Sequence, residues 1–335
     1  MKVGLIGAGR IGKIHAENIS HHIPRAQIAR LADVAVDKVR DWAGGLGIAQ
    51  VSGDYRDVLA DPEIGAVIMC SSTDTHADIV IAAAEKGKHI FCEKPVDLTV
   101  AKVKKALAAV QKAGVKIQVG FNRRFDHNFR RVRDQVRDGA IGDPHIVRIT
   151  SRDPAPPPPE YVKVSGGIFL DMTIHDFDMA RYLSGSEAVE VYAKGAVLVD
   201  PAIGKAGDVD TAVVTITFQN GCIAVIDNSR KATYGYDQRV EVFGSKGCLA
   251  CSNDTPSSVT LSTEKGVTGD KPLYFFLERY HQAFIDEMNA FFDTVIDGKP
   301  SPVGDIDGLA PLLMGFAAKK SVAEGRPVKI SEITG

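Results

Sequence analysis

The fold of this chain follows from the stretch Lys2-Val3-Gly4-Leu5-Ile6-Gly7-Ala8-Gly9-Arg10-Ile11-Gly12. Its first half is an apolar run typical of a short buried strand, and a helix-forming segment, residues 13–19, comes directly after it. The glycines form the pattern Gly-x-Gly-x-x-Gly: Gly7 makes the turn, Gly9 lets the backbone approach a pyrophosphate, and Gly12 lets strand and helix pack closely. Because the amino end of such a helix faces the phosphates, the stretch predicts a dinucleotide site.

An acidic residue stands where a ribose would need it. A second apolar strand is predicted at residues 28–32, and it ends in Asp33, about 20 residues after Gly12. A carboxylate there accepts hydrogen bonds from the ribose hydroxyls and repels a 2′-phosphate, which favours NAD over NADP. Arg10, inside the glycine loop, would soften the repulsion of a phosphate. The alternative for Asp33 is an ordinary turn residue.

Strands and helices continue to alternate as far as Gly120. The predicted strands are residues 66–70, 89–92 and 116–119, and the predicted helices are residues 75–86 and 96–113. This alternation predicts a doubly wound parallel sheet. Ligands of such sheets bind at the carboxyl ends of the strands, where the chain carries Ser71, Ser72 and Thr73.

The tripeptide Glu93-Lys94-Pro95 follows one of these strands. One interpretation of Lys94 is a solvated turn lysine, which is the usual environment of this residue. The other is an ammonium beside a nicotinamide, where it would bind a substrate hydroxyl and favour alkoxide character as hydride leaves.

Residues 166–183 carry a second candidate for chemistry. Two glycines precede apolar residues at roughly helical spacing, so we predict one helix here. Asp171 and His175 are four positions apart, which on one helix places them on the same face. A carboxylate beside an imidazole fixes its tautomer and raises its basicity, as the removal of a proton from an alcohol requires. The alternative is a surface ion pair or a helix cap.

The remaining chain predicts an antiparallel sheet of short strands joined by tight turns. The predicted strands are residues 144–152, 189–199, 212–218, 222–229, 238–244 and 248–251, and the predicted helices are residues 127–137, 275–295 and 304–323. Asn220-Gly221 is a hairpin signal between two of these strands. The proline-rich residues 154–159 form either a connector or a rigid wall of a pocket. Tyr236 either packs in the core or projects into a cleft, where a phenol suits a polyhydroxyl ligand.

Composition narrows the class of protein. The 335 residues suffice for two domains, and the net charge of −2 argues against nucleic-acid or anionic-membrane partners. No apolar stretch approaches a membrane span and no cleavage-site pattern follows Met1, so we expect a cytoplasmic protein. The five cysteines are too scattered for a disulfide framework, and Cys248 and Cys251 are interpreted as packing residues. No metal is expected, because no His, Cys or Asp cluster has ligand spacing.

Together these motifs resemble the Gfo/Idh/MocA oxidoreductases across nearly the whole chain. The resemblance rests on the glycine pattern near residue 7, on residues 93–95, and on Asp171-x-x-x-His175. Further stretches resemble the bacterial inositol 2-dehydrogenases within that family, namely residues 120–126, 150–154, 166–183 and 234–239.

The resemblance implies an α/β protein: a Rossmann domain at residues 1–120, then an α+β domain at residues 121–335 whose open, mainly antiparallel sheet builds a dimer or tetramer interface. The last helix is expected to pack back on the first domain. The implied catalytic set is Lys94, Asp171 and His175, and these bind substrate together with Arg124, Asp153 and Tyr236. The expected cofactor contacts are Gly7, Gly9, Arg10, Ile11, Gly12, Asp33, Ser71, Ser72, Thr73, His76, Glu93 and Lys94.

The implied reaction is the NAD-dependent oxidation of myo-inositol to 2-keto-myo-inositol (scyllo-inosose). The chain departs from this resemblance, since inositol dehydrogenases often carry Asn where Asp153 stands and Tyr near Phe284. An ionised Asp only accepts hydrogen bonds, so the preferred stereoisomer stays open. The alternatives are a dehydrogenase of scyllo-inositol, of another inositol isomer or of an aldose, and, in another class, a non-catalytic NAD-binding regulator.

Overall fold

The computed structural model describes residues 1–333 and divides into two compact units. Within the described residues, the first unit comprises residues 1–125 and 282–312, and the second comprises residues 126–281 and 313–333. Helix α13 (Asp305–Glu324) therefore begins in the first unit and ends in the second. No helix within residues 1–333 is both long and apolar enough to cross a membrane.

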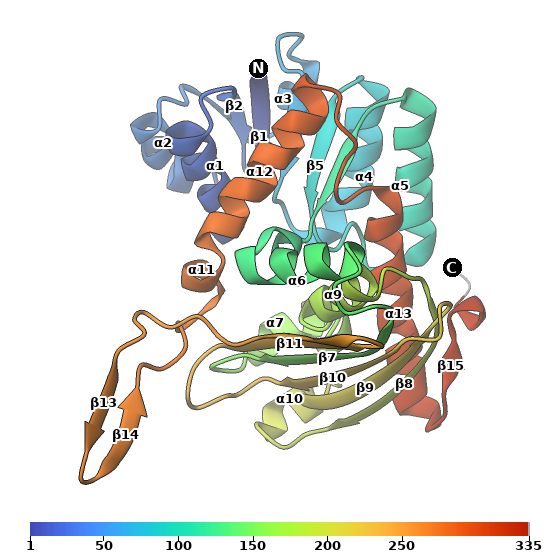
Figure 1. Cartoon of the computed structure of the whole chain (residues 1–335). Coiled ribbons are helices and arrows are strands. Elements are labelled where there is room, and N and C mark those ends of the chain that lie inside the picture. Colours follow the sequence, from blue (N-terminus) through green and yellow to red (C-terminus); the bar gives the residue numbers. More distant parts are fainter. Residues whose placement is uncertain (334–335) are drawn as a thin grey trace. The chain divides into compact units, whose positions relative to one another are not determined.

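The first unit is built on a six-stranded, all-parallel sheet in the order β3-β2-β1-β4-β5-β6 (Figure 1). Its strands are β1 (Lys2–Ile6), β2 (Gln27–Ala32), β3 (Gln50–Ser52), β4 (Ala66–Met69), β5 (His89–Glu93) and β6 (Ile117–Gly120). The central strands are buried on both faces, as continuous apolar runs require. The order reverses between β1 and β4, which is the switch point where such sheets bind ligands.

Helices cover both faces of this sheet. They are α1 (Arg10–His22), α2 (Val36–Gly45), α3 (Tyr55–Ala60), α4 (Thr73–Glu85), α5 (Val100–Ala113), the short η1 (Asn122–Phe125) and α12 (His281–Ile296). One core joins β1, β2 and β4 to α1 and α2, and Met288, Phe291 and Phe292 of α12 complete it. Helices α2 and α3 and strand β3 were not predicted. Helix α5 begins at Val100 rather than at residue 96, because Asp97 accepts a hydrogen bond from the Thr99 amide and closes a turn first (2.8 Å).

The second unit holds a seven-stranded sheet in the order β12-β11-β7-β10-β9-β8-β15. Its strands are β7 (Pro144–Arg152), β8 (Ala188–Ala196), β9 (Thr211–Phe218), β10 (Ile223–Ser229), β11 (Asp237–Gly244), β12 (Gly247–Cys251) and β15 (Val328–Lys329). Only β7 and β10 pair in parallel, so the prediction of a mainly antiparallel sheet is confirmed. The predicted hairpin at Asn220-Gly221 joins β9 to β10, with Gly221 at a φ of 84°.

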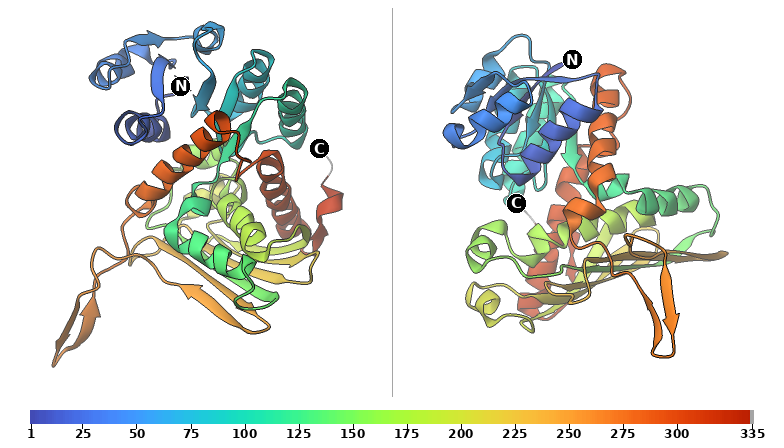
Figure 2. Two further views of the ribbon diagram at one scale, coloured as in Figure 1. Left: turned by 45° about the horizontal axis from the view of Figure 1, so that its top comes forward. Right: turned by 90° about the vertical axis from the view of Figure 1, so that its left-hand side faces the viewer.

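Exposure alternates along the strands of this sheet. In β9 the side chains of Ala212, Val214 and Ile216 are buried, whereas Val213 is exposed. Helices α6 (His127–Arg137) and α9 (Ile174–Ser184) lie along one face, as Figure 2 shows. The remaining elements of the unit are α7 (Pro159–Ser165), α8 (Ile168–Asp171), α10 (Pro201–Lys205), α11 (Phe276–Arg279), η2 (Ile330–Glu332) and the hairpin of β13 (Thr260–Thr263) and β14 (Gly266–Gly269).

Three sequence-based expectations are wrong. The helix predicted at residues 166–183 is two helices, α8 and α9, and the one predicted at residues 275–295 is α11 and α12. Cys248 is exposed and Cys251 only half-buried, because β12 is an edge strand that stays solvated, so Cys248 is not a packing residue.

Candidate active site

The glycine loop between β1 and α1 requires at least two of its three glycines. Gly7 has a φ of 89°, and a Cβ there would stand 2.5 Å from the Ser71 amide nitrogen. A Cβ on Gly12 would stand 2.0 Å from the Gly7 carbonyl oxygen. Gly9, by contrast, faces open space within 4 Å. The loop is thus packed tightly against β4 on one side and leaves its backbone accessible at Gly9, which fits a bound pyrophosphate.

Asp33, directly after β2, holds this loop in place. Its Oδ2 accepts a hydrogen bond from the Ala8 amide (2.7 Å), and its Oδ1 accepts one from the Ala35 amide (2.8 Å). Each carboxylate oxygen can accept a second hydrogen bond, so the side chain retains the capacity to accept from ribose hydroxyls. Asp33 is therefore a turn residue and a candidate ribose ligand at once.

The loops after β4 and β5 are tied together by His76, which is buried in α4. Its Nδ1 lies 2.9 Å from the Pro95 carbonyl oxygen, and its Nε2 lies 3.0 Å from the Ser71 carbonyl oxygen. This holds the loop of Ser71 to the segment that carries half-buried Lys94. His76 thus has an evident role in shaping the edge of the sheet where the cofactor is expected.

Glu93 belongs to a buried cluster of ionisable groups. His15 Nε2 lies 2.8 Å from Glu93 Oε1, and one atom each of His15, Glu93 and Glu287 lie within 4.8 Å of one another. Burial first, and then the charge of Glu93, raise the pKa of the Glu287 carboxyl well above its usual range. The sequence showed no such grouping because the three residues come from α1, β5 and α12. The expectation that no metal takes part stays a prediction.

In the second unit, two glycines open the segment that carries Asp171 and His175. Gly167 has a φ of 77°, and a Cβ there would stand 2.6 Å from Asp208 Oδ1. The Asp208 carboxylate accepts a hydrogen bond from the Ile168 amide (2.8 Å) and so holds the first turn of α8.

The predicted helix breaks between Asp171 and His175. Asp171 is the last residue of α8 and His175 is the second of α9, so the two do not share one helix. Buried Thr173 lies in the break and donates a hydrogen bond from Oγ1 to Asn228 Oδ1 (2.8 Å), while Asn228 Nδ2 donates to Asp176 Oδ2 (2.9 Å). Asn228, on β10, thereby anchors the start of α9 to the sheet.

Arg230 is the site residue that the sequence analysis missed. It lies one position after β10, and its side chain is only 4% exposed. One guanidinium nitrogen donates to Asp153 Oδ2 (3.2 Å) and the other to Asp171 Oδ2 (3.1 Å). Burial lowers the pKa of Arg230, but the charges of Asp171 and Asp153 outweigh burial, and the net shift is upward. No motif could have revealed it, since its partners are 77 and 59 positions away.

The other expected substrate residues are enclosed by protein. Arg124 is buried in η1 and donates to the Pro302 carbonyl oxygen (3.1 Å) and to Asp307 Oδ1 (2.8 Å). The ring of Tyr236 is 5% exposed and packs edge-on against Phe275 and Tyr280. Tyr161, on α7, donates to Asp171 Oδ1 (3.0 Å).

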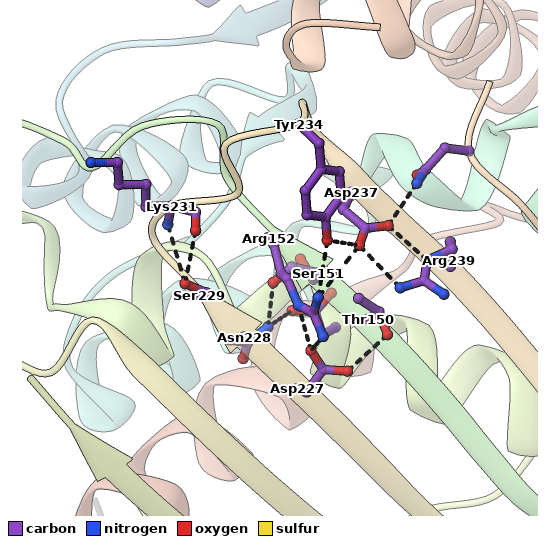
Figure 3. A network of polar contacts seen from close by, with 12 residues as sticks. Thr150, Ser151, Arg152, Asp227, Asn228, Ser229, Lys231, Tyr234, Asp237 and Arg239 are labelled. Carbon is purple, nitrogen blue, oxygen red and sulfur yellow. Dashed lines mark hydrogen bonds and ion pairs between the residues drawn. The ribbon is translucent and has the colours of Figure 1, made fainter. Parts of the chain in front are cut away.

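Figure 3 shows a polar network at the ends of β7 and β10, which includes Asn228 as well as Arg152 and Asp227. Arg152 donates from Nε to Asp227 Oδ1 (2.7 Å) and from a terminal nitrogen to the Tyr234 hydroxyl (3.0 Å). These residues line a shallow cavity of about 470 Å³. Because successive side chains of a strand point to opposite faces, Asp227 of this cavity and Asn228 of the α9 anchor lie on different sides of β10.

A glycine loop that fits a pyrophosphate, on a parallel sheet of this order, defines a dinucleotide-binding protein of the Rossmann class. The oxidoreductase family with an NAD-binding Rossmann fold matches residues 1–121, and the GFO/IDH/MocA C-terminal domain matches residues 129–250. The chain belongs to the Gfo/Idh/MocA oxidoreductase family, and its cofactor is NAD. The resemblance seen in the sequence is thus confirmed.

Individual relatives are similar over their full length. The chain is 52% identical to a myo-inositol 2-dehydrogenase of Thermotoga maritima, over 100% of both chains. It is 46% identical to an inositol 2-dehydrogenase of Rhizobium meliloti, over 99% of both. Among solved structures, it is 31% identical to scyllo-inositol dehydrogenase from Lactobacillus casei with bound NAD(H) and scyllo-inositol, with a TM-score of 0.92 over 99% of both chains.

Proposed function

We propose that this protein is an NAD-dependent inositol 2-dehydrogenase that oxidises myo-inositol to 2-keto-myo-inositol. The observation that carries the proposal is the carboxylate–arginine cluster of Asp171, Arg230 and Asp153. The His175 imidazole follows Asp171 by four positions. Full-length relatives at 52% and 46% identity that are named inositol 2-dehydrogenases support the substrate.

In the proposed mechanism, the residues of the chain bind, orient and deprotonate the substrate. The His175 imidazole takes the proton of the reacting hydroxyl, and Asp171 orients that imidazole and stabilises its charged form. The Lys94 ammonium binds the same oxygen and stabilises its developing negative charge. NAD, held by Gly7, Gly9 and Gly12 and by Asp33, supplies the hydride acceptor.

In this proposal, the protein recognises the substrate through the hydroxyls that do not react. Arg124, Asp153 and Tyr236 are proposed contacts, and Arg230 holds one oxygen of Asp153 in place. The cofactor contacts proposed besides the glycines and Asp33 are Arg10, Ile11, Ser71, Ser72, Thr73, His76, Glu93 and Lys94.

The direct test follows NADH absorbance with purified protein, NAD and myo-inositol at mildly alkaline pH, with NADP and scyllo-inositol in parallel. We expect rapid NADH formation from myo-inositol. Turnover of another polyol but not of myo-inositol would support the same reaction on a different substrate. Tight NAD binding without turnover of any inositol isomer or aldose would favour the alternative of a non-catalytic regulator.

The roles of Lys94 and His175 are tested by Lys94→Ala and His175→Ala. Each variant should lose about 100-fold or more of kcat, as expected for removal of an electrostatic stabiliser or a general base, while NAD binding persists. Fluorescence titration with NADH provides the binding control. Near-normal turnover in either variant would remove that residue from the mechanism.

The second candidate substrate is scyllo-inositol. The Lactobacillus casei relative with bound scyllo-inositol shares this fold at 31% identity. In the proposed site, Asp153 helps to set which inositol stereoisomer is preferred. A ratio of kcat/KM above one for scyllo- over myo-inositol would establish this candidate.

We further propose a cytoplasmic homo-oligomer, a dimer or tetramer, that associates through the second unit's sheet. The exposed apolar side chains of Val213, Ile223 and Phe243 on this sheet support such a contact. The proposed domain division remains residues 1–120 and 121–335. Light scattering of the protein and of Phe243→Asp tests the association, and an unchanged mass in the variant would argue against this face.

A further inference from the structure

We infer that Arg230 is a positioning residue that couples substrate recognition at Asp153 to the orientation of the proposed base by Asp171. The inference rests on the proposed function, in which Asp153 binds a substrate hydroxyl and Asp171 orients the base, His175. It adds a physical link between the two carboxylates. Because one guanidinium fixes both of them relative to each other, a displacement of either carboxylate alters the position of the other.

The contacts have the form of a bridge. The two terminal nitrogens of the guanidinium point to different carboxylates, at 3.2 Å for Asp153 and 3.1 Å for Asp171. A planar guanidinium holds its nitrogens at a constant separation and angle, so two carboxylates bound in this way keep a constant separation. A lysine ammonium supplies the same charge without that geometry.

Arg230 is a counter-charge that two carboxylates share. The side chains of Arg230, Asp153 and Asp171 are 4%, 16% and 16% exposed. Without the guanidinium, the two carboxylates would repel each other, so removal of the Arg230 side chain should change their separation.

The backbone positions of these residues do not depend on the bridge. The Arg230 amide donates to the Asp210 carbonyl oxygen (2.8 Å), and the Asp153 amide donates to the Ser229 carbonyl oxygen (2.9 Å). Asp153 and Arg230 are thus placed by the adjoining ends of β7 and β10. Substitution of the Arg230 side chain should therefore alter the two carboxylates before it alters the fold.

The test compares the parent, Arg230→Ala and Arg230→Lys. We expect Arg230→Ala to lose about 100-fold in kcat for myo-inositol, the loss typical of a misplaced catalytic group, with the KM for NAD within about twofold of the parent. Added guanidinium ion, at concentrations that leave the parent unaffected, should restore part of this loss. Arg230→Lys keeps the charge, so it should fold, yet it should change the ratio of kcat/KM for myo- and scyllo-inositol.

A double-mutant cycle measures the coupling itself. If Arg230 links the two carboxylates, Asp153→Asn should lower kcat markedly in the parent and little in the Arg230→Lys background. Arg279→Lys is the matched control, because Arg279 is a buried arginine that bridges Asp126 and Asp254 outside the proposed site. It should lower the melting temperature similarly and leave the isomer ratio unchanged.

The outcomes separate two failures. A parent that oxidises no polyol would overturn the proposed function and this inference with it. An active parent with additive effects of Asp153→Asn and Arg230→Lys, or with no guanidinium rescue of a folded Arg230→Ala, would overturn the inference alone.

Discussion

At the scale of single residues, Glu287 is an ionisable side chain in the buried interior. It is fully buried in α12, and neither of its carboxylate oxygens has a hydrogen-bond partner within residues 1–333. Water is the better solvent for its charged form, so burial and the neighbouring Glu93 raise the pKa of this carboxyl above the ordinary value of 4.5. Both causes favour the protonated form of Glu287 in the folded protein.

This leads to a prediction about pH. Between pH 4.5 and the raised pKa, the folded state holds a proton that the unfolded state has lost, so the contribution of Glu287 to stability declines as pH rises. Glu287→Gln has no such titration. The free energy of unfolding of the variant should therefore increase relative to that of the parent as the pH rises above about 4.5.

Urea unfolding followed by fluorescence measures the effect, since the single Trp, Trp42, packs against the same core as α12. Asp286→Asn, one residue away on the same helix, is the control for loss of an acidic side chain. An identical pH dependence in Glu287→Gln and the parent would contradict the assignment.

At the element scale, α9 is held in place from the sheet rather than by its own sequence. Its start is anchored by Asn228, which contacts Thr173 and Asp176 and also donates to the Ser151 carbonyl oxygen (3.2 Å). Because of the break before α9, His175 and Asp171 do not lie on one continuous helix. A side chain of β10 thus controls where the proposed base lies.

We therefore predict that Asn228→Ala costs about 3 kcal/mol of unfolding free energy, because buried polar groups of Thr173 and Asp176 lose a partner. It should also lower kcat. Asn253→Ala removes a comparable anchor of Asp237 elsewhere in the second unit and should lower stability without the loss of turnover. Circular dichroism and the NADH assay measure both, and equal kcat losses in the two variants would contradict the role given to Asn228.

At the scale of the whole molecule, the first unit carries the nucleotide site. A ligand that binds only the folded state raises stability by RT ln(1 + [L]/Kd), which is about 2.7 kcal/mol at a hundredfold excess over Kd. We predict a rise in melting temperature with NAD and a smaller rise with NADP, since Asp33 repels a 2′-phosphate. Equal rises with both cofactors would indicate that Arg10 offsets the charge of Asp33. Asp33→Ser should narrow the difference.

Much of the fold could be predicted from the sequence alone. The parallel sheet follows from local patterns: continuous apolar strands, glycines at the turn after β1, and an acidic residue after β2 all act over short distances. The hairpin at Asn220-Gly221 and the alternating strands of the second unit are local in the same sense. Lys94, Asp171 and His175 could be proposed as catalytic residues from the sequence because they belong to contiguous motifs.

Only the tertiary structure decided which side chains meet across long separations. The break between α8 and α9 depends on Asn228 and Asp208, which lie 55 and 40 positions from their partners Thr173 and Ile168. Arg230 and the cluster of His15, Glu93 and Glu287 likewise assemble from strands and helices remote in the chain. The physical reason is that hydrogen bonds and buried charges act through space, whereas a linear pattern records only what each element requires by itself.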